Sequence, residues 1–146
     1  MMTAQEELLL ALRLVIAAAL GAMIGMERER HGRRVGVRTF AAVSLGACAF
    51  SIISYVVVPE GNETTRIAAQ VVSGIGFLGA GVILRSHGHV SGLTTAASLW
   101  ATAAVGMAIG YGLLILGTAT AVLLLLLLLL RSIAKSDRDD GEQTNL

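Results

Sequence analysis

Three glycines in the middle of the chain have the spacing of a phosphate-binding loop. Gly74, Gly76 and Gly79 form G-x-G-x-x-G, which in dinucleotide-binding enzymes lets the backbone approach a pyrophosphate at the start of a helix. Such a site also needs a preceding strand and an acidic residue about 20 positions later for the ribose. The sequence has no acidic residue between Glu63 and Asp137, and the preceding R-I-A-A-Q-V-V-S favours a membrane helix. We therefore predict that the chain binds no nucleotide.

Few other residues have side chains in an arrangement that could bind a metal or catalyse a reaction. His87 and His89 form H-x-H, but a structural metal site usually needs four ligands, and the sequence offers no third ligand of metal type nearby. No pairing of a nucleophile with a base emerges from the sequence either. We predict no metal, no cofactor, no catalytic residue and no enzymatic activity, and nothing indicates nucleic-acid binding.

The amino-acid composition indicates which kind of secondary structure holds these residues in place. Of the 146 residues, 55% are hydrophobic and only 14% are charged, against roughly a quarter charged in typical globular proteins. The apolar residues form long runs rather than alternating patterns, which indicates membrane spans. Five runs of about 18–20 residues are long enough to cross a bilayer as helices. They are Leu8–Met26, Thr39–Val58, Ile67–Leu84, Leu93–Gly110 and Leu113–Leu130.

These runs predict an all-α fold: a polytopic membrane bundle of five transmembrane helices over residues 1–130, in contact with the lipid bilayer. Nine of the eleven basic residues fall in the loop 27–38, at Arg85 or in the tail after Leu130. Helices in series place these three segments on one side of the membrane. The positive-inside rule makes that side cytoplasmic, with the N-terminus outside and the C-terminus cytoplasmic. The polar tail 131–146 is predicted to be disordered.

Small residues recur at helical spacing within the predicted spans. In lipid, helices associate by close backbone approach at small residues, so we predict packing roles for these glycines. They are Gly21, Gly25, Gly74, Gly76, Gly79, Gly81, Gly106 and Gly110. The alternative for Gly74–Gly81 is that the helix loosens near mid-membrane and exposes carbonyls that coordinate ions.

Polar side chains inside the spans share helical faces. Three sets have this spacing: Ser44, Cys48 and Ser51; Arg66, Gln70 and Ser73; and Thr95, Ser98 and Thr102. They could form one internal hydrogen-bonding seam, or each hydroxyl could bond to a carbonyl of its own helix. An amide facing lipid is costly, so Gln70 is expected to face inward. Trp100, near the middle of its run, is expected to be a packing residue.

A charged strip begins where the first span ends. Glu27 is the acidic residue nearest the hydrocarbon on the predicted cytoplasmic side, and Arg38 and Arg85 should lie at similar depth. Glu29 and Arg33 are spaced for an i, i+4 ion pair on a solvated helix end. A carboxylate ringed by arginines at the mouth of the bundle is expected to be a structural clamp or a partner-binding surface.

Three long segments of the chain resemble the membrane domain of the MgtC/SapB family. They are G-A-M-I-G-M-E-R-E-R-H-G-R-R-V-G-V-R-T (21–39), R-I-A-A-Q-V-V-S-G-I-G-F-L-G-A-G-V-I-L-R (66–85) and S-G-L-T-T-A-A-S-L-W-A-T-A-A-V-G-M-A-I-G (91–110). One small departure is Val35–Thr39, where the family usually has an A-G-L-R-T-like segment. Longer members add a soluble domain resembling the ACT fold, whereas about 16 residues follow the last run here, as in a short member.

The resemblance implies a multi-pass protein of the bacterial inner membrane, associated with magnesium limitation and with survival of pathogens inside host cells. It also implies regulation of other membrane proteins, including the proton-translocating ATP synthase, rather than transport of magnesium. By position, the family's signature residues map onto Glu27, Arg28, Glu29, Arg38, Thr39, Arg66, Gln70, the glycines 74–81, Arg85, Thr94 and Thr95.

Two functions therefore stand from the sequence. The first is a non-enzymatic regulator that binds another membrane protein, with self-association through small-residue faces also possible. The second is a transporter or channel for magnesium or another ion, with the Gly74–Gly81 helix lining the path. A hydrated dication should meet carboxylates or a carbonyl filter on its way. The acidic residues all lie outside the five runs or at their edges, which favours the regulator.

Overall fold

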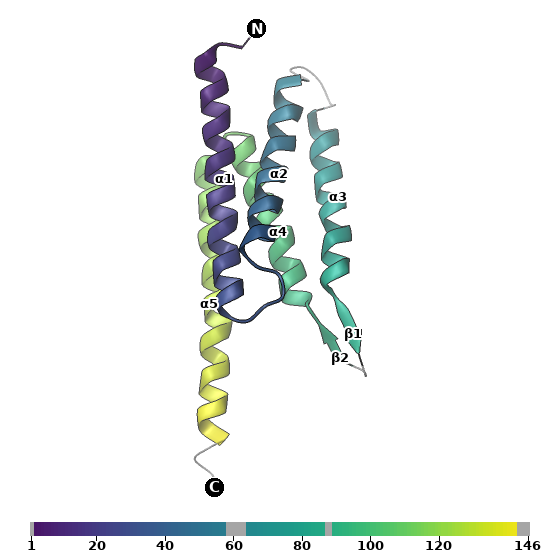
Figure 1. The fold of residues 1–146 in the computed structure, drawn as a ribbon, viewed down its shortest axis with the longest axis vertical. Coiled ribbons are helices and arrows are strands. Elements are labelled where there is room, and N and C mark those ends of the chain that lie inside the picture. The colour runs from purple at the N-terminus through teal and green to yellow at the C-terminus, as the bar shows by residue number, and fades with distance from the viewer. Residues whose placement is uncertain (1, 58–63, 87–88, 143–146) are drawn as a thin grey trace.

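The fold of the chain is known from a computed structural model, which describes residues 2–57, 64–86 and 89–142. Five helices and one short hairpin follow in order (Figure 1). They are α1 (Ala4–Arg30), α2 (Val37–Val57), α3 (Thr64–Val82), β1 (Leu84–Ser86), β2 (His89–Ser91), α4 (Leu93–Gly110) and α5 (Leu114–Glu142). The all-α prediction is confirmed.

α1 is longer than its apolar run because polar residues extend both ends. At its start, the Thr3 hydroxyl accepts from the Glu6 amide, and the Thr3 amide donates to Glu6 Oε2 at 2.8 Å. This reciprocal capping box satisfies amides that have no partner inside the helix. At its end, the His31 amide bonds to the Glu27 carbonyl, and Gly32 continues with a φ of 65°. α1 therefore carries Glu27 to Arg30 as its last turn.

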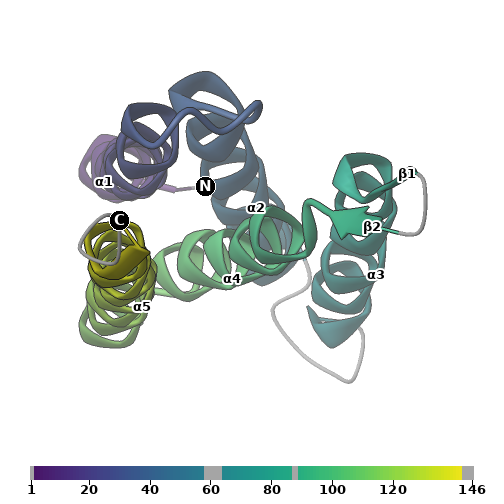
Figure 2. The same cartoon turned by 90° about the horizontal axis from the view of Figure 1, so that it is seen from below.

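Successive helices run in opposite directions, so the α1–α2 loop, the hairpin and the end of α5 lie at one end of the bundle (Figure 1). α2 and α4 pack against each other, with α1 on both and α5 against α4 and α1. α3 packs on α2 and α4 at the edge of the bundle, as the end-on view in Figure 2 shows. Gly92 (φ 91°) follows β2 and is the N-cap of α4. A Cβ on Gly92 would overlap the Val82 carbonyl oxygen.

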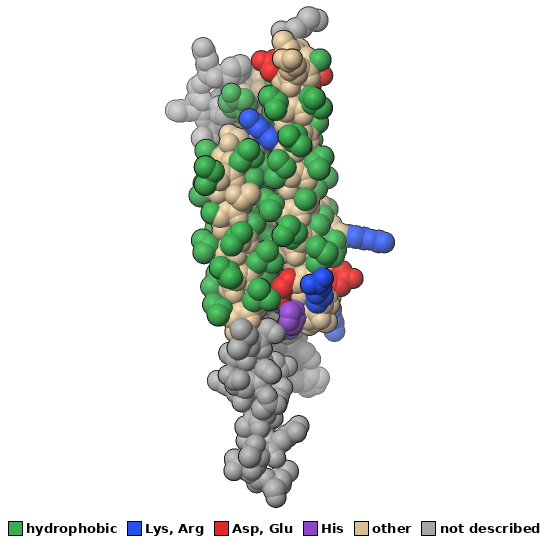
Figure 3. Space-filling model, turned by 90° about the vertical axis from the view of Figure 1, so that its left-hand side faces the viewer, with side chains coloured by type: hydrophobic (Ala, Val, Ile, Leu, Met, Phe, Trp, Pro, Cys, Tyr) green, Lys and Arg blue, Asp and Glu red, His purple; other side chains and the backbone are tan. Residues whose placement is uncertain are grey.

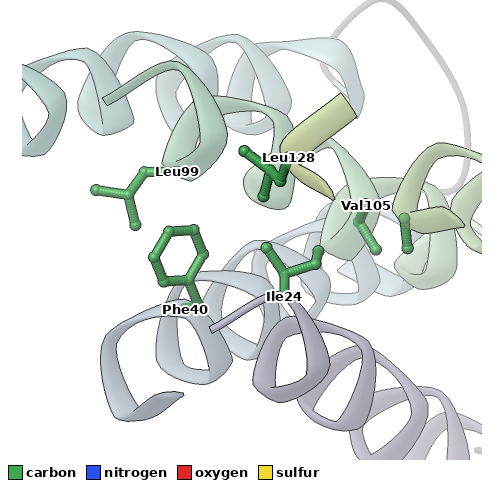
Figure 4. Packing of buried hydrophobic residues seen from close by; sticks show 6 residues of the cluster. Ile24, Phe40, Leu99, Val105 and Leu128 are labelled. Atoms are coloured by element: carbon green, nitrogen blue, oxygen red, sulfur yellow. The ribbon is translucent and has the colours of Figure 1, made fainter. Parts of the chain in front are cut away.

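The core lies where four helices meet. Ile24 of α1, Phe40 of α2, Leu99 and Val105 of α4, and Leu128 of α5 are at most 5% exposed and form one cluster (Figure 4). A second cluster toward the other end joins Ala17, Cys48, Ile52 and Ile109. Both clusters bring together α1, α2 and α4, so these helices form the centre of the bundle.

Many large hydrophobic side chains lie on the lateral surface of the bundle. Figure 3 shows hydrophobic side chains covering α1 and α5 between charged ends, and Phe77 and Ile115 are 82% and 86% exposed. Such a surface implies contact with a lipid bilayer. Within the described residues, three helices are long and apolar enough to cross a membrane: Ala4–Arg30, Val37–Val56 and Leu93–Gly110. Two shorter apolar helices span Arg66–Val82 and Leu114–Leu130.

Three details differ from the sequence expectations. The connection after the third predicted span contains a short hairpin that was not predicted, in which β1 and β2 pair antiparallel with Arg85 opposite Val90. α5 continues to Glu142, beyond the predicted end of the last span at Leu130. Trp100 is 55% exposed on the side of α4, not packed in the core. In lipid, an exposed indole carries no penalty comparable to that in water.

Candidate functional site

The last turn of α1 holds a buried charge cluster. Glu27 and Arg28 are only 8% and 3% exposed, and Arg28 Nη1 lies 3.5 Å from Glu27 Oε2. His31 Nδ1 lies 3.1 Å from Glu27 Oε1 and 2.8 Å from the Glu27 carbonyl oxygen. Both oxygens are acceptors, so this ring nitrogen carries the hydrogen and donates. Figure 3 shows the charged side chains gathered at this end, below the apolar wall.

Glu29, two residues after Glu27, bonds to the backbone of α2. Its Oε2 accepts from the Val37 amide at 3.1 Å, across eight residues of chain. Val37 begins α2, so the carboxylate satisfies a free amide and lies at the positive end of the helix dipole. Gly36 leaves room for it, because a Cβ there would lie 2.5 Å from Glu29 Oε2. The helix ends at Arg30, so Arg33 lies outside it and the predicted Glu29–Arg33 helical pair does not form.

No charged residue of the predicted site other than Arg28 forms an ion pair with Glu27 among the described side chains. Arg38 is exposed in the first turn of α2, and Arg66 is exposed at the opposite end of the bundle, in the first turn of α3. The backbone of Arg85 lies in β1, while its side chain, like all of His87, falls outside the described residues. Among the described side chains, the ion partners of Glu27 are Arg28 and His31. Arg38 therefore forms no ion pair with Glu27, and the expected role of Arg85 beside Glu27 falls outside the described side chains.

The polar side chains within the helices mostly bond to their own backbone. Ser51 donates to the Ala47 carbonyl, Thr102 to Ser98, and Ser98 to Thr94 and Thr95. Thr95 is 7% exposed, whereas Thr94 is half-buried. Ser44 Oγ is buried and has no hydrogen-bond partner among the described residues. This is the alternative in which hydroxyls bond within one helix, not a seam across three helices.

Four of the predicted packing glycines lie against α2. A Cβ on Gly21 would come 2.5 Å from the Phe40 carbonyl oxygen, and one on Gly25 would come 2.6 Å from Val37 Cα. From the other side, Gly106 of α4 lies against the Ser44 carbonyl, and Gly110 against Cys48 and Ser51. No side chain fits at these positions without moving backbone. The glycines thus set the distances of α1 and α4 from α2.

Arg13 has a role that sequence reasoning missed. Its Nη1 donates to the Gly110 carbonyl at 3.2 Å, and its guanidinium lies beside Gly112, in the turn between α4 and α5. A cation at the last carbonyl of α4 complements the helix dipole. Arg13 and Gly110 are 97 residues apart in the chain. Nothing in the sequence indicated that they would be in contact.

The glycines of α3 are not packed against another helix as closely as those of α1 and α4. A Cβ on Gly74, Gly76 or Gly81 would meet nothing within 4 Å, and one on Gly79 would make only an ordinary contact with Ala96. An apolar groove of about 520 Å³ separates α3 from α2. It is lined by Thr39, Ala42, Val43, Gly46, Ala47, Phe50, Ile67, Gln70, Val71, Gly74, Ile75, Leu78 and Ala103.

Gln70 is exposed along this groove rather than buried in the bundle, contrary to the expected inward position. α3 packs only at the edge, so a residue on its α2-facing side opens to the surroundings. No group of three His, Cys, Asp or Glu side chains that could hold a metal ion occurs in the described part of the chain.

Comparison with known proteins gives one consistent result. The model of the MgtC family matches residues 14–136. Over 113 residues the chain is 44% identical to the "Putative magnesium transporter YhiD" of Escherichia coli K12, covering 73% of this chain and 53% of that protein. It is 50% identical over 101 residues to the protein MgtC of Salmonella typhimurium LT2, covering 69% and 43% respectively. The chain therefore spans about half the length of these relatives. No solved structure matches it significantly.

Proposed function

Because the chain belongs to the MgtC family, we propose that it is a non-enzymatic regulator in the bacterial inner membrane that acts by binding another membrane protein. Its five apolar helices would all cross the membrane, with the N-terminus outside and the C-terminus cytoplasmic. The setting would be adaptation to low magnesium and to stress of the kind met in virulence. The ATP synthase is the partner that the family resemblance implies.

The proposal rests on one observation: the centre of the helix bundle is closely packed, whereas its edge, at α3, is open. Gly21, Gly25, Gly106 and Gly110 bring α1 and α4 into backbone contact with α2. A dication that keeps its water shell needs a wide polar path, and a bare one needs several oxygen ligands. The buried hydroxyls of Ser51, Ser98 and Thr102 are bonded to their own helices. The centre of the bundle therefore offers little to a magnesium ion.

The edge of the bundle offers a surface for a helix of another protein. The groove between α2 and α3 is lined almost wholly by apolar side chains, with Thr39 and Gln70 as its polar groups. Glycines on α3 leave space for a neighbouring backbone to approach closely. An amide at this position is stabilised when a partner supplies hydrogen bonds, because lipid cannot. We assign the partner contact to the groove and the outer face of α3.

Magnesium transport is the second candidate, and the name of the Escherichia coli relative favours it. In that case the ion path would follow the α2–α3 groove, and Gln70 and the carbonyls of the Gly74–Gly81 segment would supply its ligands. The groove would then have to be closed toward lipid by a further chain, since it is open in the single molecule.

Magnesium flux into proteoliposomes containing only this protein separates the two candidates. We expect no flux from protein that is folded and inserted. Saturable flux that is lost in Gln70→Ala and Gly76→Leu would support transport and contradict the regulator.

Crosslinking in cells tests the proposed contact face. A photoactivatable residue in place of Phe77, 82% exposed on α3, is expected to crosslink to another membrane protein, identified by mass spectrometry. The matched control is the same residue in place of Ile115, 86% exposed on α5. Equal crosslinking from both positions would mean that α3 has no special role.

A further inference from the structure

The segment that joins α1 to α2 carries a strong positive charge that no described contact uses. Arg30, Arg33, Arg34 and Arg38 are all exposed, and none of the four forms an ion pair within the described part of the chain. Glu27 is buried and shared by Arg28 and His31. Glu29 is the one exposed carboxylate of the segment, and it is held by the Val37 amide. Four guanidinium groups therefore face outward with little local compensation.

The backbone that presents these arginines is fixed by hydrogen bonds. The Gly32 amide donates to the Glu29 carbonyl at 3.0 Å, and the Arg33 amide to the Arg28 carbonyl at 3.1 Å. Glu29 Oε2 then ties the far end of the loop at Val37. Arg30 ends α1, and Arg38 lies in the first turn of α2. A ligand that binds here orders side chains only, so little binding energy is lost to ordering the loop.

The position of the loop selects the ligand. It lies directly at the end of the apolar wall, where charged side chains replace hydrophobic ones (Figure 3). In a bilayer that level is occupied by lipid headgroups. Guanidinium groups bind phosphate oxygens with paired hydrogen bonds, and basic clusters next to a span attract anionic lipids.

We propose that Arg30, Arg33, Arg34 and Arg38 form a binding surface for the phosphate groups of anionic phospholipids. The surface holds the α1–α2 end of the bundle at the membrane boundary. It requires that the chain lies in a bilayer, but it does not depend on whether the chain regulates a partner.

Native mass spectrometry of the full chain in neutral detergent tests the proposal. The chain is titrated with phosphatidylglycerol or with phosphatidylcholine. We expect tighter binding of phosphatidylglycerol, and about a fivefold loss of its affinity for each arginine removed. The Arg33→Gln/Arg34→Gln variant should thus lose about 25-fold and Arg38→Gln about fivefold. The replaced side chains are exposed, and circular dichroism checks that each variant is folded.

The matched control removes the same charge elsewhere. Lys135→Gln/Arg138→Gln loses two positive charges from the C-terminal segment, and it should keep wild-type affinity. Inorganic phosphate at the lipid concentration should not displace phosphatidylglycerol. The proposal is overturned by equal binding of the two lipids, by equal losses in loop and control variants, or by displacement with inorganic phosphate, which would indicate a general anion site.

Discussion

At the scale of single residues, two carboxylates of similar sequence context have different functions in the structure. Glu27 and Glu29 lie in E-R-E-R, and both are signature positions by resemblance to the family. Glu27 is buried with Arg28, whereas Glu29 is exposed and bonded to the α2 backbone. The sequence placed Glu27 nearest the hydrocarbon and Glu29 on a solvated helix end, but it gave no sign that Glu29 would bond to the first amide of α2. Their substitution should therefore have different consequences.

Glu27→Ala is expected to destabilise the protein by about 3 kcal/mol. Glu27 is an ion partner of Arg28, which is 3% exposed, and loss of one member of a buried ion pair is strongly destabilising. Reversible unfolding in detergent measures the loss. Glu7→Ala, an exposed carboxylate in the first turn of α1, is the control and should remain near wild type. Equal stability of the Glu27 and Glu7 variants would contradict the buried pair.

Glu29→Ala should cost less, about 1 kcal/mol, which is typical for loss of a helix-capping side chain. Glu29→Gln keeps an oxygen that can accept from the Val37 amide, so it should retain most of the stability. The same unfolding measurement distinguishes the two variants. If alanine and glutamine behaved alike, the hydrogen bond at 3.1 Å would contribute nothing measurable.

At the scale of helices, small-residue spacing predicted close approach but could not say to what. Gly106 and Gly74 both occur in small-residue patterns of apolar helices. One lies against the Ser44 carbonyl, while the other has open space. The small-residue pattern indicates that the backbone of another helix can approach closely. Which helix approaches depends on how the five helices are arranged in the bundle. The helix ends were missed for a similar reason, since the capping residues Thr3 and Glu6 lie outside the apolar run.

Alanine at these two glycines gives a matched pair. Gly106→Ala should destabilise by about 1–3 kcal/mol, since a methyl group there would force α4 away from α2. Gly74→Ala should be neutral or stabilise by up to about 1 kcal/mol, because alanine is the better helix former. Unfolding in detergent compares them directly. A loss at Gly74 equal to that at Gly106 would mean that α3 packs more tightly than described.

At the scale of the whole molecule, sequence predicted the number and order of the apolar helices but not their neighbours. In a membrane, the lipid-facing and protein-facing sides of a helix are both apolar, so periodicity does not distinguish α2 at the centre from α3 at the edge. The arginine distribution does predict a direction across the membrane. The loop, the hairpin and the end of α5 lie at one end of the bundle (Figure 1), as a shared cytoplasmic side requires.

Single cysteines in intact cells test that direction. Cys48 is the one cysteine of the chain and is buried, so a Cys48→Ala background removes it with little volume change. A membrane-impermeant maleimide should then label Gln5→Cys, which lies in the first turn of α1, without lysis. Ser91→Cys, exposed in β2 at the opposite end, should be labelled only after lysis. The reverse pattern would place the arginine-rich end outside and remove it from the leaflet where the positive-inside rule requires it.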